Sequence, residues 1–289
     1  MKVEKMEGIQ STWALYFLIF NFSKEHTLAR SGNTIMLKII SDNFQQHATK
    51  IPAFCDGMKA FDLKHLLFVD SGLSCDTFNI IYIHRSDVTK EELVEALNYF
   101  RLNKLDYCIW VNQESLCSNV ESLFKSFNIE EKASEVGMAL DLKDYQSISD
   151  EKYENIKSVK DSKTLATYAN IIAKNWTPAD QNILSYYEKT VNYYLDPDNG
   201  IQLLIYYHDG QPVSCVELFP SDSKTVGFYG FATLEKYRGM GIGTTLLTFA
   251  LNMAKDLGFK NAILQGTKDG LNIYMKFGFK DYTTYYEFA

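Results

Sequence analysis

The chain of 289 residues is short of cysteine and histidine and has no cluster of positive charge. Its five cysteines are odd in number and contain no Cys-x-x-Cys pair, which argues against a disulfide framework and against a zinc knuckle. The five histidines are scattered, so no metal site is expected. The formal net charge is -7 and no basic block occurs, so nucleic acid is not expected as a partner. Reduced thiols in a cytoplasmic protein are the simplest interpretation.

Long hydrophobic runs are also missing. The most apolar stretch, Thr12–Phe22, has about half the length that a membrane-spanning helix needs, so no membrane association is expected. Two lysines precede this stretch, but two glutamates cancel their charge and no small-residue cleavage site follows. We expect residues 1–35 to be an N-terminal extension. Three roles stay open for this extension: a secretory leader, a flap packed on the first domain, or an extension upstream of a start at Met36.

The composition is typical of a folded protein, and the length favours two domains. Hydrophobic residues make up 46% and charged residues 22% of the chain, far from the signature of disorder. A chain of this length can form one large core or two ordinary ones. The run Lys143–Lys160 is polar, charged and poor in large apolar side chains. We therefore predict two domains, residues 36–150 and residues 151–289, of which the first is the more acidic.

Helix and strand patterns alternate in the first predicted domain. The segment Lys90–Asn103 has apolar residues mostly at helical spacing, behind a capping box formed by Thr89 and Glu92. The other predicted elements are a helix at Asp42–His47, strands at Phe78–His84, Tyr107–Val111 and near Val136–Leu142, and a helix near Val120–Phe127. This alternation predicts a small α/β domain.

The second predicted domain has an antiparallel meander between helices. The Asp209-Gly210 step is a strong hairpin signal, Thr177 and Pro178 indicate a helix start, and Gly258 indicates a helix end. The predicted elements are helices at Ser162–Lys174 and Asp180–Tyr194, strands at Ile201–Tyr207, Pro212–Phe219 and Thr225–Thr233, a helix at Thr244–Leu257, a strand at Ala262–Gln265, a helix at Gly270–Lys276 and a strand at Tyr282–Phe288. We expect an α/β fold of the α+β kind, with a mixed, mostly antiparallel sheet flanked by helices.

Three glycines, Gly239, Gly241 and Gly243, lie between a predicted strand and the helix that follows it. Backbone N–H groups at such a junction can point into one concavity, and the missing side chains leave room for a pyrophosphate. The helix N-terminus adds roughly half a positive charge, and Arg238 and Lys236 add full charges nearby. The junction is therefore predicted to bind a nucleotide cofactor.

Two familiar phosphate-binding loops do not fit this junction. The dinucleotide fingerprint Gly-x-Gly-x-x-Gly fails because Leu246 lies three residues after Gly243. A P-loop requires Gly-Lys-Ser/Thr, whereas Gly243 is followed directly by Thr244. The antiparallel meander before the junction also differs from the parallel βαβ units of both folds.

The residues instead resemble the GNAT superfamily of N-acetyltransferases over about residues 155–289. Arg238-x-x-Gly241-x-Gly243 is similar to the family signature Arg/Gln-x-x-Gly-x-Gly/Ala, and Tyr274 precedes Gly278-Phe279 as in the family's second landmark. The resemblance implies an acyl-CoA, acetyl-CoA first of all, as cofactor and co-substrate. The residues implied to bind it are Phe231, Ala232, Thr233, Arg238, Gly239, Met240, Gly241, Ile242, Gly243 and Thr244. The backbone of Phe231–Thr233 would bind the pantetheine arm like an extra strand.

Direct acyl transfer needs three groups besides the cofactor. A backbone N–H freed by a bulge near Ala232–Thr233 would stabilise the oxyanion, and the Tyr274 hydroxyl would protonate the leaving thiolate. Glu217 is the candidate base, because burial on its strand beside Val213, Cys215 and Phe219 would raise its pKa. Two alternatives stay open: a packing role for Tyr274, and an edge position for Glu217 with a surface lysine as partner.

Other candidates and departures from the family pattern weaken or extend this assignment. Glu235 is a weaker candidate base, since it should face solvent, and Cys215 is either a nucleophile or, as is more common, a core residue. Many family members have an asparagine where this chain has Thr267, so Asn272 is a substitute cofactor contact. Residues 36–150 resemble the divergent partner domain of tandem members, without a glycine junction.

These observations favour an enzyme that transfers an acyl group, acetyl first of all, from acyl-CoA to a primary amine of a small molecule or peptide in a ternary complex. The acidic first half makes a cationic acceptor attractive. A non-catalytic acyl-CoA-binding or sensor protein is the alternative from another class, and a structural protein that only kept the fold is a third. The acceptor, the acyl chain length and the oligomeric state stay open.

Overall fold

The computed structural model describes the backbone of residues 10–289 and the side chains of residues 32–289. The chain divides into two compact units, Met1–Ile39 and Ile40–Ala289. Helix α1 (Gln10–Phe54) begins in the first unit and enters the second at Ile40. Within the described part of the chain, no helix has both the length and the apolar composition needed to cross a bilayer. Residues 1–9 and the side chains of residues 10–31 lie outside the description, so the role of residues 1–35 stays a prediction.

The first half of the second unit has the predicted alternation of strands and helices. After α1 the elements are β1 (Lys59–Asp62), β2 (Leu66–Asp70), β3 (Ile80–Ile83), α2 (Lys90–Asn103), β4 (Cys108–Asn112), α3 (Ser118–Phe127) and β5 (Glu131–Asp141). Every helix and strand predicted for this part is confirmed, and the helix predicted at Asp42–His47 is part of α1. The capping box of Thr89 and Glu92 at the start of α2 is also confirmed. Strands β1 and β2 were not predicted.

The second half contains the predicted helices and the meander. Its elements are β6 (Ile156–Ser158), α4 (Ser162–Ala173), α5 (Gln181–Lys189), α6 (Val191–Tyr194), β7 (Gln202–His208), β8 (Gln211–Pro220), β9 (Thr225–Thr233), α7 (Ile242–Asp256), β10 (Asn261–Gly266), α8 (Leu271–Lys276) and β11 (Lys280–Phe288). Asp209 and Gly210 have positive φ in the hairpin, and Gly258 has φ +90° after α7, both as predicted.

The helix start predicted at Thr177 and Pro178 is wrong. Helix α5 begins at Gln181, because the carboxylate of Asp180 accepts a hydrogen bond from the N–H of Asn182 and so caps the helix. The predicted helix Asp180–Tyr194 is also divided in two at Thr190, whose hydroxyl donates to the Tyr186 carbonyl at 2.7 Å.

The strands form one 11-stranded sheet in the order β1-β2-β3-β4-β11-β5-β10-β9-β8-β7-β6. Pairing is parallel between β3 and β4 and between β9 and β10, and antiparallel at the other neighbours. Strand β5 closes the first half but lies between β10 and β11. Strand β11 closes the second half but lies between β4 and β5. We call this arrangement the strand exchange; it makes one sheet from both halves.

The two halves of the sheet repeat the same order of elements. Three antiparallel strands are followed by a helix, a strand parallel to the third, a second helix and a last strand. The order is β1-β2-β3-α2-β4-α3-β5 in the first half and β7-β8-β9-α7-β10-α8-β11 in the second. The repeat agrees with a divergent first domain of the same kind, while the domain bounds 36–150 and 151–289 stay a prediction.

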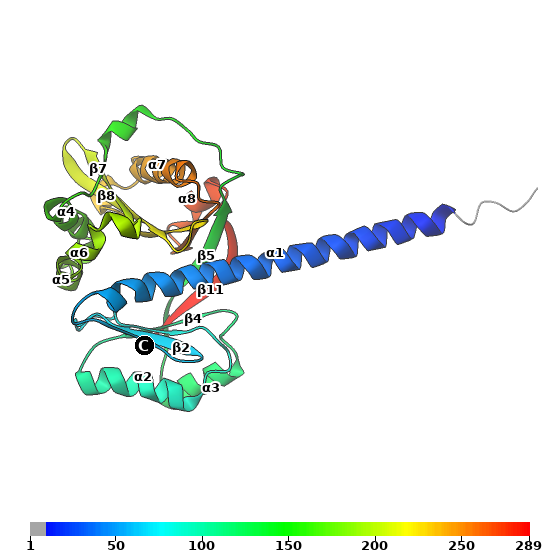
Figure 1. Cartoon of the computed structure of the whole chain (residues 1–289), viewed down its shortest axis with the longest axis horizontal. Helices are drawn as coiled ribbons and strands as arrows, with labels where there is room; N and C mark the ends of the chain where they lie inside the picture. Colours follow the sequence, from blue (N-terminus) through cyan, green and yellow to red (C-terminus); the bar gives the residue numbers. More distant parts are fainter. Residues whose placement is uncertain (1–9) are drawn as a thin grey trace, which may run out of the picture. The chain divides into compact units, whose positions relative to one another are not determined.

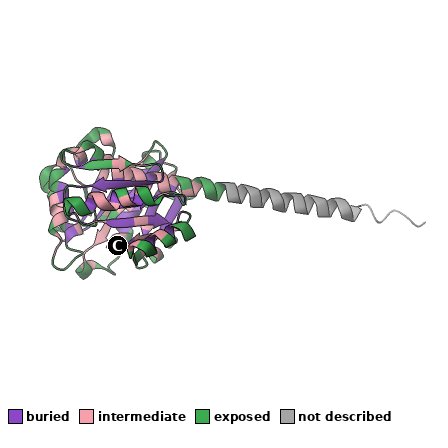
Figure 2. Cartoon of the chain, turned by 90° about the horizontal axis from the view of Figure 1, so that it is seen from below, coloured by how far each residue is buried: buried purple, intermediate pink, exposed green. Residues whose placement is uncertain are grey.

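Helices cover both faces of the sheet. In the first half α2 and α3 pack on one face of β2–β4, where Leu93, Phe100 and Phe124 are buried (Figure 1). In the second half α7 and α8 cover one face. Helices α4 and α5 cover the opposite face, together with Ile51 of α1. Buried residues follow the strands, and exposed ones lie on the outer sides of the helices (Figure 2). The predicted mixed, mostly antiparallel α/β fold is therefore confirmed.

Candidate active site

The glycine junction, residues 238–244, lies where β9 leads into α7. Gly241 is the N-cap of α7 with φ +79°, and Gly239 has φ +77°. A Cβ atom built on either glycine would meet no atom within 4 Å, so both backbones border open space. The cap makes no side-chain hydrogen bond, and the first N–H groups of a helix have no acceptor within the helix. The junction therefore fits a pyrophosphate bound by backbone amides.

Arg238 holds the junction to two neighbouring elements. Its Nε donates to the Thr233 carbonyl at 2.9 Å, and its Nη2 donates to Oδ1 of Asn175 at 3.0 Å. Asn175, which follows α4, was not predicted as part of the site, since nothing in its local sequence indicates this long-range partner. The guanidinium is exposed and keeps further N–H groups for an anion. Met240 and Thr244 are exposed beside it, whereas Ile242 is buried and anchors the start of α7.

Strands β9 and β10 diverge next to this junction. Their pairing spans only Thr225–Gly227 of β9 and Asn261–Ile263 of β10, although β9 continues to Thr233. Within the described part of the chain, the later residues of β9 have no partner strand on that side, and we call this stretch, residues 228–233, the splayed edge. Its residues 231–233 are half-buried. The splayed edge leaves backbone groups for a ligand that binds like a strand.

Gly243 lets α7 approach the splayed edge closely. A Cβ atom at this position would lie 3.4 Å from Cζ of Phe231 and 3.5 Å from Oγ1 of Thr233. Two of the predicted cofactor residues thus lie close to the helix that forms the glycine junction, where a side chain on Gly243 would touch them. The structure brings the predicted pantetheine-binding and pyrophosphate-binding residues together.

A β-bulge interrupts β9 at the start of the splayed edge. Cys215 pairs with Ala232 and Glu217 with Tyr229, so two residues of β9, Gly230 and Phe231, lie opposite one residue of β8. Gly230 has φ +53°. The bulge therefore lies slightly before the predicted position at Ala232–Thr233.

Gly230 also permits a close approach to α4. A Cβ atom there would lie 2.7 Å from the hydroxyl oxygen of Tyr168, so a larger residue would require the buried Tyr168 side chain to shift. The extra residue turns Phe231 toward α7 and α8, whereas Tyr229 and Ala232 face α4. The bulge thus directs neighbouring side chains of β9 to opposite faces of the sheet at the splayed edge.

Tyr274 on α8 packs against the splayed edge. Its ring lies 6.2 Å from that of Phe231 and 6.0 Å from that of Phe279, and its side chain is 8% exposed. Burial, and then the charge of Glu135, raise the pKa of the Tyr274 phenol well above its ordinary value. The hydroxyl is therefore protonated at neutral pH and able to donate. Asn272 lies on the exposed side of α8, away from Tyr274.

Glu217 lies on the opposite face of the sheet from Tyr274 and is only 2% exposed. Its Oε2 accepts a hydrogen bond from the Tyr194 hydroxyl at 3.5 Å, and its Oε1 lies 3.5 Å from Nε2 of His47 on α1. The alternative of an edge carboxylate with a lysine partner does not hold, because β8 is flanked by β7 and β9. Glu235 is exposed, as expected.

Val213, predicted on the same face as Glu217, packs in the opposite core. The partners of Tyr206 and Tyr207 on β8 are Ser214 and Pro212, so Val213 is an extra residue that breaks the alternation. Cys215 and Phe219 share the face of Glu217, as predicted. Burial raises the pKa of the Cys215 thiol, which agrees with a core role for this residue.

His47 is a site residue that the sequence did not indicate. Its ring stacks on Tyr229 with 3.6 Å between centroids and 6° between planes, and it meets Phe219 edge-on at 5.0 Å. Tyr229 lies opposite Glu217 and directly before the bulge. Because His47 is far from these residues in the sequence, no motif spacing could connect it to them.

Glu135 on β5 is a second acidic group that was not predicted. Burial, reinforced by the charge of Glu287, raises the pKa of Glu135 to about 7. It lies opposite Tyr285 of β11, so the strand exchange places a residue from the end of the second half beside it. The predicted strand near Val136–Leu142 stopped one residue short of it.

The equivalent junction in the first half is capped by its own side chains. At the start of α2 the Thr89 hydroxyl accepts from the N–H of Glu92, and the Glu92 carboxylate accepts from the N–H of Thr89. Glu91 and Glu92 also place negative charge in the first turn of the helix. Strands β3 and β4 remain paired over Ile80–Ile83, so no edge is splayed there. Among the residues that the structure describes, a glycine junction beside a splayed edge occurs in the second half alone.

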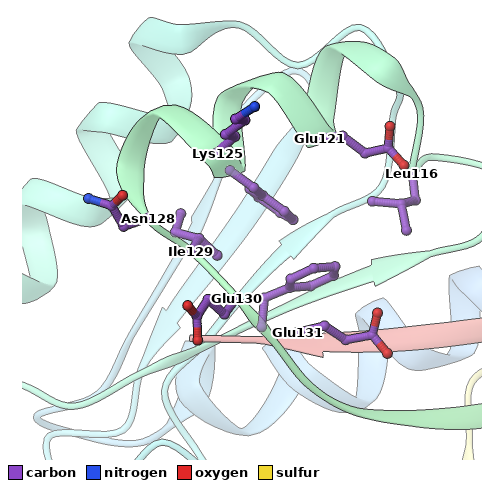
Figure 3. Close-up of a pocket in the computed structure, with 9 residues that line it drawn as sticks. Leu116, Glu121, Lys125, Asn128, Ile129, Glu130 and Glu131 are labelled. Atoms are coloured by element: carbon purple, nitrogen blue, oxygen red, sulfur yellow. The ribbon is translucent and has the colours of Figure 1, made fainter.

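A cavity of about 420 Å³ lies elsewhere, between α3 and the ends of β5 and β11 (Figure 3). Its lining includes Glu121, Glu130, Glu131 and Lys125 around the Phe124 and Phe288 side chains. None of the predicted site residues lines it. Among residues 32–289 no group of three or more possible ligands is placed to hold a metal ion.

Comparisons with known proteins agree with this geometry. Residues 166–279 match the model of the acetyltransferase (GNAT) family, a range that includes the glycine junction and Tyr274. A GCN5-related N-acetyltransferase from Kribbella flavida has a similar structure, with TM-score 0.62 and 15% identity, covering 87% of this chain and 93% of that one. A functionally unknown conserved protein from Staphylococcus epidermidis gives TM-score 0.58 and 17% identity, with 81% and 94% covered.

A tandem GNAT protein from the clavulanic acid biosynthesis pathway gives TM-score 0.51 and 9% identity, with 77% of each chain covered. These similarities extend over the first half of the sheet as well and establish the shared fold. The family match covers the residues that form the junction and the edge. Residues 166–279 of this chain therefore form a domain of the acetyltransferase (GNAT) family.

Proposed function

We propose that the protein transfers an acetyl group from acetyl-CoA to a primary amine of a small molecule or peptide, by direct attack within a ternary complex. Membership of residues 166–279 in the acetyltransferase (GNAT) family supports acyl-CoA-dependent N-acyl transfer in general. The catalytic domain comprises residues 151–289, and residues 36–150 form a divergent GNAT-like domain. The repeated order of elements and the similarity to a tandem GNAT protein support this division.

One observation carries the proposal: β9 separates from β10 after Gly227, and the chain that continues from the end of β9 forms the glycine N-cap of α7. The amides of residues 239–244 bind the pyrophosphate, and Arg238 adds its charge. The backbone of residues 231–233 binds the pantetheine arm as a short strand. Asn272 completes the cofactor contacts from α8. The acetyl group then lies at the bulge, between the two faces of the sheet.

The chain's own groups provide the remaining chemistry. A backbone N–H at the bulge, near Ala232, stabilises negative charge on the carbonyl oxygen, since a fixed amide in a dry site is effective there. Tyr274 is packed against Phe231 and protonated at neutral pH, so it donates a proton to the leaving thiolate. Glu217 supplies the negative charge that favours removal of a proton from the acceptor's ammonium group. Because Glu217 is buried, a more exposed neighbouring group has to receive that proton from the acceptor.

Two measurements test this function. Calorimetric titration with acetyl-CoA measures donor binding, and release of free thiol in the presence of a panel of primary amines measures transfer. We expect binding, and turnover with at least one cationic amine, because the acceptor face contains Glu217. Absence of binding at millimolar acetyl-CoA would refute the donor site. Binding without any thiol release would instead show a non-catalytic acyl-CoA-binding protein.

A further inference from the structure

We propose that His47 is the catalytic base of this site and that Glu217 is the positioning residue that holds it. This inference rests on the proposed acyl transfer to an amine. It assigns the proton-accepting atom to α1, outside the residues that match the family model. The first half of the chain then contributes a reacting group to the site in the second half.

The two side chains face each other in a buried environment. Nε2 of His47 and Oε1 of Glu217 are 3.5 Å apart, which is an ion-pair distance. Both atoms are shielded from solvent, and neither has a hydrogen-bond partner among the described residues. Buried polar atoms are usually paired, because each unpaired one loses the hydrogen bonds it would make with water. Each of these two atoms is therefore the natural partner of the other.

The carboxylate is fixed in orientation from its other side. Oε2 of Glu217 accepts the hydrogen bond of the Tyr194 hydroxyl, which leaves Oε1 directed at His47. A carboxylate accepts hydrogen bonds and does not donate them. The His47 ring therefore presents its N–H at Nε2, and its lone pair is at Nδ1. A histidine held in one tautomer by a carboxylate is a common arrangement for a base.

Access distinguishes the two residues. Glu217 is 2% exposed, so an acceptor amine cannot reach it, whereas the His47 side chain is 28% exposed. Nε2 is shielded, so the exposed part of the side chain lies elsewhere on the residue, and we place the proton-accepting lone pair there, at Nδ1. The stacking on Tyr229 places the ring beside the residue that precedes the bulge. His47 can therefore accept a proton at the point where β9 opens.

The proton balance of the reaction is complete with these groups. The acceptor ammonium loses one proton to Nδ1 of His47, and its nitrogen lone pair forms the new C–N bond as the C–S bond breaks. The second proton of the nitrogen restores Tyr274, which has given its own proton to the leaving thiolate. His47 then releases its proton to solvent. No oxidant, reductant or metal is needed.

The first test is the variant His47→Asn, assayed by thiol release from acetyl-CoA with the best amine of the panel. We expect a fall in kcat/KM of about 100-fold at pH 7, with unchanged acetyl-CoA affinity by calorimetry. The defect should shrink near pH 10, because a substantial fraction of an alkyl amine with a pKa of about 10.4 is then already neutral. The groups facing His47 are Glu217 from β8 and Tyr229 from β9, with Tyr194 of α6 behind Glu217.

His208→Asn is the matched control. His208 also lies beside a carboxylate, 3.6 Å from Asp209, but in the exposed β7–β8 hairpin. We expect full activity from this variant. Equal pH profiles of His47→Asn and the unmodified protein would overturn the proposal. Where His47→Asn does not fold, His47→Gln replaces it, because its amide can still donate to Glu217.

The second test needs no acceptor and separates this inference from the function. Nitrogen NMR of histidine-labelled protein identifies the His47 signals by their loss in His47→Gln. We expect neutral His47 to have the proton on Nε2, and Glu217→Gln to weaken this preference while His208 is unaffected. A proton on Nδ1 in the unmodified protein would overturn the proposal even if acetyl-CoA binds. Failure to bind acetyl-CoA would refute the proposed function independently of the tautomer.

Discussion

Tyr274 combines contact with the splayed edge and a phenol that stays protonated. Replacing it by Phe keeps the ring that packs on Phe231 and removes only the hydroxyl. We expect Tyr274→Phe to lower kcat by about 100-fold with little change in acetyl-CoA affinity, because proton donation to the thiolate is lost. Steady-state kinetics and calorimetry measure the two effects. Tyr286→Phe is the control, since Tyr286 packs in the core of the first half, and equal turnover in both variants would remove Tyr274 from the mechanism.

The pKa of Glu135 predicts how stability depends on pH. Burial raises this pKa from 4.5 to about 7, so the folded state keeps a proton that the unfolded state has already lost. The contribution to stability is therefore fully present below pH 4.5 and is lost as the pH rises through 7. Glu135→Gln removes this loss. The quantity to compare is the free energy of unfolding of the variant minus that of the unmodified protein. We expect this difference to be larger at pH 8 than at pH 4.5 by at most about 3 kcal/mol.

Urea denaturation of both proteins at several pH values measures this gain. The matched control is Glu131→Gln on the same strand, whose side chain is exposed. A constant difference between Glu135→Gln and the unmodified protein from pH 5 to pH 8 would show that Glu135 is not strongly desolvated.

The helix α7 has a glycine of positive φ next to each end, which allows a matched experiment on the element. Gly241 and Gly258 have φ values of +79° and +90°, and a Cβ atom at either position would meet nothing within 4 Å. Gly241→Asp places a side chain and a negative charge at the glycine junction, whereas Gly258→Asp introduces similar backbone strain at the far end. We expect about 100-fold weaker acetyl-CoA binding for Gly241→Asp only. An equal loss of acetyl-CoA affinity in the two variants would show that backbone strain in α7 causes the effect.

The elements were largely predictable because their signals are local. The helices α2 and α7 have apolar residues at helical spacing with a cap or glycine at their ends, and the β7–β8 turn has Asp209-Gly210. Strand β1 has no such signal, since its residues Lys59–Asp62 are mostly exposed, and β6 has only three residues. The start of α5 was misplaced because Thr177 and Pro178 imitate a start signal that Asp180 provides.

The site was predictable only where a motif is continuous in the sequence. The glycine junction and Tyr274 follow from short patterns within the second half. His47, Glu135 and Asn175 come from α1, β5 and the end of α4, and they reach the site through pairing between distant segments. The bulge at Val213 likewise depends on register, which the alternation of residues alone does not reveal.

The strand exchange makes the two halves depend on each other. Residues 151–289 alone lack β5, which otherwise pairs with both β10 and β11. Because β4 is missing as well, the fragment would expose both edges of β11 and one edge of β10, all of which are internal in the whole protein. We expect it to show no cooperative unfolding and no acetyl-CoA binding, and co-expression with residues 1–150 to restore both. Denaturation followed by circular dichroism, together with calorimetry, measures this outcome.

The two separated pieces provide their own control, because each contains the same residues as in the whole chain. A fragment of residues 151–289 that unfolds cooperatively and binds acetyl-CoA would contradict this prediction. It would also show that the sheet of the second half is complete without β5.

The position of β11 also constrains the order of events during protein synthesis. This strand occupies the middle of the sheet, between β4 and β5, yet its residues Lys280–Phe288 are translated after every other strand. Strands β4 and β5 must therefore wait, with open edges, until residues 142–288 have also left the ribosome. During that interval the nascent first half is a natural client for chaperones that shield unpaired strands.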